Sequence, residues 1–70
     1  MKLEQHDLDF MKLLLRSPAY GEGWRHVAPG LIKLCEIAVG RRPELYEFDT
    51  TSNPSRIRLT ERGSILADYV

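Results

Sequence analysis

Arginine side chains are the residues of this chain best suited to a binding function. Four of them fall in two close pairs, namely Arg41, Arg42, Arg56 and Arg58. Guanidinium groups neutralise phosphates, so a single surface that carried all four would favour binding to duplex DNA. The alternative is that Glu44 and Glu47, on a neighbouring strand, pair with the second pair of arginines in a solvated ladder of charges. Ten basic and ten acidic side chains give no net charge, so the charge balance favours neither interpretation.

No residue pattern in the chain is typical of catalysis or of a metal site. His6, His26 and Cys35 lack the spacing of metal ligands, and a structural zinc ion needs four of them. No serine lies in a nucleophile-elbow pattern, and the GEG stretch lacks the further glycine and the lysine of a phosphate-binding loop. Trp24 and Tyr20 could stack on a base or a peptide, although a single Trp in a small domain is more often part of the core. We therefore expect no enzymatic activity, no metal and no cofactor.

Length and composition predict a single small domain that spans residues 1–70. With 43% hydrophobic and 29% charged residues, the composition is that of a folded globular protein. Only a limited core can form at this size, so a partner chain, such as a second copy, would stabilise the domain by covering apolar surface. The single cysteine, Cys35, suits a reducing cytosol, and no apolar run is long enough to span a bilayer. We therefore expect a cytoplasmic protein that has no membrane partner.

Helical periodicity predicts two helices in the first part of the chain. Apolar residues between 3 and 16 form one wide helical face, and Asp7 can cap that helix or favour its N-terminal dipole. A second helix is predicted over residues 29–39, where a proline suits the first turn and Gly40 is expected to end the helix. The intervening residues 19–27 contain two glycines, and their last four fit either a short strand or one helical turn.

A hairpin followed by a helix is predicted at the C-terminal end. Residues 44–48 and 56–59 read as antiparallel strands around the turn-forming run DTTSNPS. The hydroxyl of Thr60 can cap a last helix that runs from about residue 61 to the C-terminus. Gly63 would lie in the first turn of that helix, where glycine is unfavourable, so we expect the turn to press closely against the hairpin.

The order of these elements resembles that of the winged-helix DNA-binding domains, including the MarR-like and PadR-like regulators. In that family a strand of the wing commonly ends in a Leu-Thr-x-x-Gly pattern before a packing helix, and Leu59, Thr60 and Gly63 match the pattern. The resemblance covers roughly residues 29–66. It implies an α+β fold in which helices pack on a C-terminal β-hairpin, the wing, that is followed by a final helix.

One departure from the winged-helix pattern concerns the helix that would enter the major groove. The family places two helices between the first helix and the wing, whereas only residues 29–39 form a convincing helix here. Lys33 and Glu36 are its only charged side chains. Because base edges are read by polar and charged groups, this helix has few side chains that could recognise a DNA sequence. Further apolar residues lie outside its inward stripe, namely Ile32, Ile37 and Val39. The same helix therefore also fits a core or an interface position.

Two functions follow from the resemblance and from the residues. The first is a small DNA-binding regulator, acting as a dimer or beside a partner, in which Lys33 and the four arginines contact DNA. The loop tip would add Ser52 and Asn53, which could touch a phosphate or a minor groove as wing tips do in that family, although turn formation alone also explains them. The second is a winged-helix module used for protein–protein contact without DNA binding. Arginines paired with glutamates beside an exposed apolar patch would favour the second function.

Overall fold

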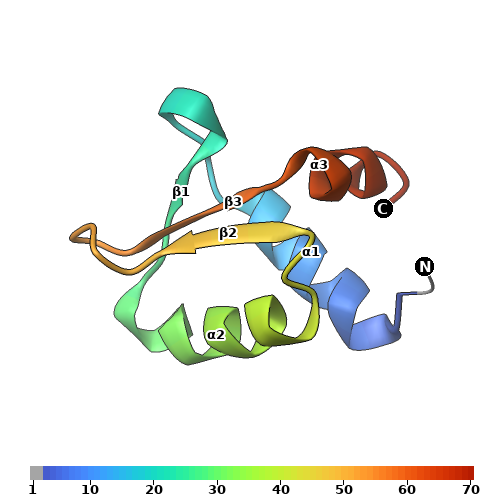
Figure 1. Cartoon of the computed structure of the whole chain (residues 1–70), viewed down its shortest axis with the longest axis horizontal. Helices are drawn as coiled ribbons and strands as arrows, with labels where there is room; N and C mark the ends of the chain where they lie inside the picture. Colours follow the sequence, from blue (N-terminus) through green and yellow to red (C-terminus); the bar gives the residue numbers. More distant parts are fainter. Residues whose placement is uncertain (1–2) are drawn as a thin grey trace.

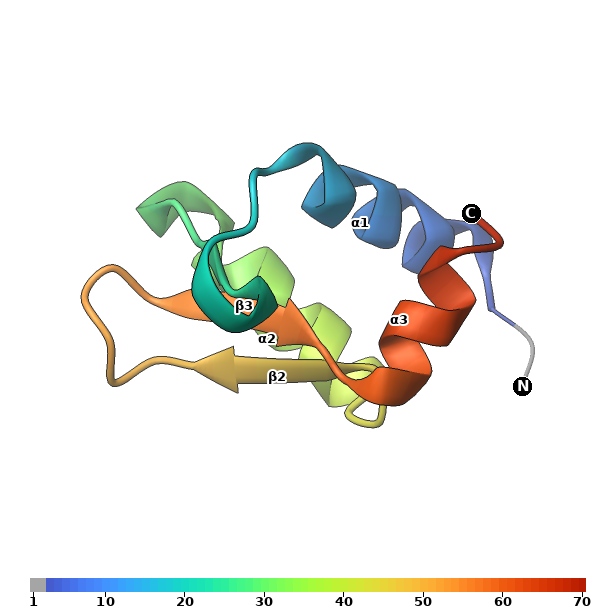
Figure 2. The same ribbon diagram turned by 90° about the horizontal axis from the view of Figure 1, so that it is seen from above.

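The computed structural model describes residues 3–70 and has the expected α+β class. It contains three α-helices, a three-stranded antiparallel sheet and two single 3-10 turns. The elements in chain order are α1 (Gln5–Arg16), η1 (Gly21–Gly23), β1 (Arg25–His26), η2 (Pro29–Leu31), α2 (Ile32–Arg41), β2 (Tyr46–Asp49), β3 (Arg56–Leu59) and α3 (Glu61–Ala67). The hairpin loop and α3 lie at opposite ends of the molecule (Figures 1 and 2).

The predicted hairpin is confirmed, and it is completed by a third strand. β3 is the central strand and pairs antiparallel with both β2 and β1. For the end of segment 19–27 the sequence left either a short strand or one helical turn open. The structure shows the strand, because Arg25 and His26 pair with β3 after the single turn η1. Strand β2 begins at Tyr46, two residues later than predicted, and includes Asp49.

The hydrophobic core lies on one side of this sheet. In Figure 1, α2 runs beneath β2 and β3, whereas η1 lies above them. Ile57 of β3 is almost fully buried, and it packs with the apolar faces of α1 and α2. The ring of Phe10 meets that of Tyr46 edge to face, with 5.4 Å between the ring centroids. Because side chains alternate along a strand, Arg56 and Arg58 must point to the side away from these helices.

The corner between β3 and α3 has the close contact that was expected from glycine. A Cβ atom on Gly63 would overlap the backbone carbonyl oxygen of Leu45 and crowd the side chain of Leu59. The hydroxyl of Thr60 accepts a hydrogen bond from the backbone N–H of Gly63 (3.1 Å), so the cap is confirmed. The same hydroxyl donates to the backbone carbonyl of Glu44 (2.6 Å). The Leu-Thr-x-x-Gly pattern therefore fastens α3 to the segment before β2.

The second helix differs from its prediction at both ends. Its first residues form the 3-10 turn η2, and α2 proper starts at Ile32. Gly40 does not end it: the helix continues to Arg41, and the N–H of Arg42 donates to the carbonyl of Ala38. A left-handed glycine is the usual stop, and Gly40 does not adopt a positive φ. Within residues 3–70, α2 is the only α-helix between α1 and the hairpin.

Candidate interaction surfaces

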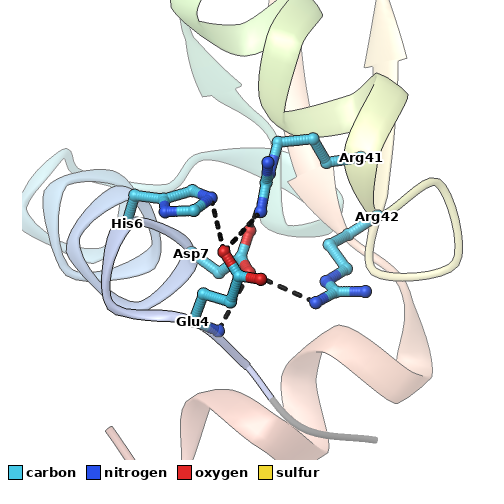
Figure 3. A network of polar contacts seen from close by, with 5 residues as sticks. All are labelled: Glu4, His6, Asp7, Arg41 and Arg42. Carbon is cyan, nitrogen blue, oxygen red and sulfur yellow. Dashed lines mark hydrogen bonds and ion pairs between the residues drawn. The ribbon is translucent and has the colours of Figure 1, made fainter.

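The first arginine pair belongs to a cluster that joins the start of α1 to the end of α2. This helix cluster consists of Glu4, His6, Asp7, Arg41 and Arg42 (Figure 3). Asp7 is its centre: Arg41 Nε lies 3.4 Å from one carboxylate oxygen, and Arg42 Nη2 lies 3.4 Å from the other. Arg41 also reaches the carboxylate of Glu4 at 3.3 Å. Both arginines are therefore engaged by acids on another helix.

Asp7 is the only buried charged residue in the part of the chain that the structure describes, with 5% of its surface exposed. It also completes a capping box, because it accepts a hydrogen bond from the backbone N–H of Glu4 (3.1 Å). Burial acts to raise the pKa of Asp7, but this N–H and the two guanidinium groups outweigh burial and hold the pKa below its usual value. Asp7 therefore remains ionised, and it caps α1 as well as binding α2.

The second arginine pair belongs to a separate hairpin cluster on the outer side of the sheet, made of Glu22, Glu47, Asp49, Arg56 and Arg58. Arg56 Nε lies 2.9 Å from Asp49, and Arg58 Nε lies 2.6 Å from Glu47. Arg58 also approaches Glu22 at 3.6 Å. The hydroxyl of Thr51, the guanidinium of Arg56 and the backbone N–H of Thr51 hold the pKa of Asp49 well below its usual range.

One predicted partner in this cluster was wrong. The alternative of a charge ladder paired Glu44 with a hairpin arginine, but the structure gives that role to Asp49. The register of the hairpin explains the difference, because Asp49 lies opposite Arg56 and Glu47 lies opposite Arg58. Glu44 precedes the strand, where its backbone carbonyl binds Thr60.

Trp24 lies beneath the two arginines of the hairpin cluster. The guanidinium carbons of Arg56 and Arg58 are 4.1 Å and 4.4 Å from the centroid of its ring. Trp24 is 8% exposed, yet it does not belong to the core formed with α1 and α2. The ring is thus buried as expected but is covered by charged side chains, in a geometry that favours cation–π attraction. The alternation in RIRL predicts that both arginines lie on one face of the strand. It does not predict that Trp24 is the residue they cover.

The other candidate DNA contacts are scattered. Lys33 is exposed on α2, and Asn53 is exposed at the hairpin tip. Ser52 donates from its hydroxyl to Asp49 (3.0 Å), so it serves the turn. The four arginines that could have formed one basic patch are divided between two clusters on different sides of the sheet.

An apolar groove lies between α1 and α2, and Ile37 is the part of it that the sequence predicted as apolar surface outside the inward stripe. Two hollows, both lined by Phe10 and Leu34, follow one another along the helices. The larger, of about 170 Å³, is lined by His6, Asp7, Phe10, Leu34, Ile37, Ala38 and Tyr46. On its α2 side Leu31 and Leu34 are each 40% exposed, and Ile37 is 55% exposed. Of the three residues predicted to lie outside the inward stripe, Ile37 is exposed to solvent, whereas Ile32 and Val39 are half-buried and pack against the core.

Among residues 3–70, no helix has the length and apolar character needed to cross a membrane. The same residues contain no group of three or more His, Cys, Asp or Glu side chains placed to hold a metal ion. No protein-family model matches the chain, and neither a curated protein nor a solved structure is significantly similar to it.

Proposed function

We propose that this chain is a small cytoplasmic protein-interaction module of winged-helix type, which acts without catalysis and without binding DNA. The observation that carries the proposal is the pairing of the arginines. Each of the four has a carboxylate within 3.4 Å, so phosphates would have to compete with acids that are already in place. The helix cluster sets two arginines against Glu4 and Asp7, and the hairpin cluster sets two against three acids. Neither cluster has the excess of positive charge on which non-specific affinity for DNA depends.

The character of α2 supports the same function. In a domain of winged-helix type, α2 would correspond by its order in the chain to the recognition helix. Lys33 and Glu36 are its exposed charged side chains before the arginine pair. The large hydrophobic side chains that it exposes are Leu34 and Ile37. A helix of this kind offers little to the edges of bases, whereas an apolar surface rimmed by charges is typical of a protein interface.

A titration of labelled random duplex DNA, at about 50 mM and about 200 mM salt, tests the proposal. We expect no saturable binding by the wild-type domain at either salt concentration. The double variant Arg56→Ala/Arg58→Ala should behave in the same way towards DNA. It should have a lower Tm, because it removes the ion pairs of the hairpin cluster and uncovers the ring of Trp24.

Saturable binding at the lower salt concentration would contradict the proposal and restore the DNA-binding alternative. In that case the double variant should weaken binding to all duplexes about equally and reduce the salt dependence by roughly two units, about one for each lost phosphate contact. Lys33→Ala provides a comparison for DNA affinity, because it removes a basic side chain from α2 without disturbing either arginine cluster.

A further inference from the structure

The exposed side of α2 has the residue spacing of a helix that packs against another helix. Cys35 and Ala38 face the core, whereas Leu34 and Ile37 form a second apolar line beside it. Their three-residue separation is continued by Leu31, one turn earlier, and the line is bordered by Leu13 of α1, which is 37% exposed. A helix with two apolar sides is normally covered on both, and within residues 3–70 only one side is covered.

The charges on α2 indicate what covers the second side. Lys33 and Glu36 are both exposed. With 3.6 residues per turn, both fall on the flank of the apolar line that is turned away from Cys35 and Ala38. When two copies of a helix pack antiparallel about a two-fold axis, equivalent flanks face each other. With Leu34 set against Ile37 of the other copy, Lys33 of each copy comes within reach of Glu36 of the other. The chain is also neutral overall, so no net charge opposes the approach of two copies.

We propose that the partner of this surface is a second copy of the chain, bound through antiparallel packing of α2 on α2 with two reciprocal Lys33–Glu36 contacts. This inference rests on the proposed function, since it names the partner of the interaction module. The contact involves one short helix from each copy, flanked by Leu13, so its area lies at the low end for specific interfaces. The dimer is accordingly weak and reversible, and it forms at high local concentration.

Sedimentation velocity over a range of concentrations up to roughly 1 mM tests the dimer. The wild-type domain should show a concentration-dependent shift from monomer to dimer. Ile37→Glu should weaken association at least about tenfold, because it places an acid in the apolar line. Ile65→Glu on α3 is the matched control: Ile65 is 56% exposed, nearly the same as Ile37 at 55%, and it should leave association unchanged.

Exchange of the charges at positions 33 and 36 then tests the antiparallel arrangement. It distinguishes this arrangement from non-specific association through apolar side chains. Lys33→Glu alone and Glu36→Lys alone should each weaken association, because every reciprocal contact becomes a pair of like charges. An equimolar mixture of these two variants should regain wild-type association, since both contacts are then complementary between the different chains.

Several results would overturn the dimer. They are a wild-type domain that remains monomeric at the highest concentration, a mixture that fails to regain association, and equal loss with Ile37→Glu and Ile65→Glu. Circular dichroism of each variant confirms that it is folded. A monomeric protein that also ignores DNA refutes only the dimer, whereas a protein that binds DNA refutes the proposed function itself.

Discussion

The helix cluster and the hairpin cluster use the same chemistry in different surroundings. In both, two arginines bind carboxylates, but Asp7 is 5% exposed whereas the side chain of Glu47 is 48% exposed. The helix cluster joins residues far apart in the sequence, whereas the hairpin cluster mainly joins residues across one turn, with Glu22 as a more distant member. Coulomb attraction and hydrogen bonds are stronger where water is excluded, so the two clusters differ in their contribution to stability. A buried carboxylate with several donors fixes two helices together, whereas the exposed pairs mainly cover Trp24.

The largest effect is expected when the ring beneath the hairpin cluster is removed. Trp24→Ala should lower the free energy of unfolding by about 2–3 kcal/mol, because it exposes the surface that the ring buries and ends both guanidinium contacts. The expected loss of unfolding free energy does not exceed that for an aromatic side chain in a core, because the flexible arginine side chains can move into the space that the ring leaves. Urea denaturation measures the change, with Trp24→Phe as the milder control. A loss below about 0.5 kcal/mol would mean that the ring only rests on the surface.

An intermediate effect is expected at the centre of the helix cluster. Asp7→Asn should cost about 1–2 kcal/mol, because it weakens charge-assisted hydrogen bonds to two arginines and to the N-terminal turn of α1. The matched control is Asp9→Asn, since Asp9 is exposed and accepts a hydrogen bond only from Gln5 among the contacts of the described residues. Equal losses in the two variants would contradict the central position of Asp7.

Acid titration sharpens the same prediction. The folded state lowers the pKa of Asp7 below its ordinary value of 3.8, so its stabilising contribution is complete above that pH. The contribution is lost as the pH falls through the lower pKa of the folded state. Thermal melts between pH 7 and pH 2 should therefore show a steeper loss of stability in the wild-type domain than in Asp7→Asn. Parallel curves would show that Asp7 titrates alike in the folded and unfolded chains.

The smallest effect is expected at an exposed member of the hairpin cluster. Glu47→Gln should cost about 0.2–1 kcal/mol, because the ion pair with Arg58 is largely solvated and Glu22 remains nearby. Salt should reduce the difference between Glu47→Gln and wild type further, whereas the effect of Asp7→Asn should persist. Urea denaturation at about 0.1 M and about 1 M salt measures both, and a salt-insensitive loss at Glu47 would remove the distinction between the clusters.

Local patterns were sufficient to predict most of the secondary structure. Alternation in RIRL and the run DTTSNPS indicated the hairpin, because a strand period and turn-forming residues depend on a few neighbouring positions. Gly63 predicted a close approach for a similar reason, since glycine in a first helical turn has a known cost. The strand at Arg25 and His26 stayed undecided, because two residues carry no periodicity of their own and depend on pairing with β3.

The sequence by itself determined the α-helices and the hairpin, the absence of a net charge and the face on which Arg56 and Arg58 lie. Only the tertiary structure decided which acids bind them and that Arg41 and Arg42 reach back to Asp7, 34 and 35 positions away along the chain. It also left Leu34 and Ile37 in solvent, although their residue types fit a core equally well. The physical reason is that propensity and periodicity are properties of short segments, whereas burial and charge pairing depend on how distant segments pack.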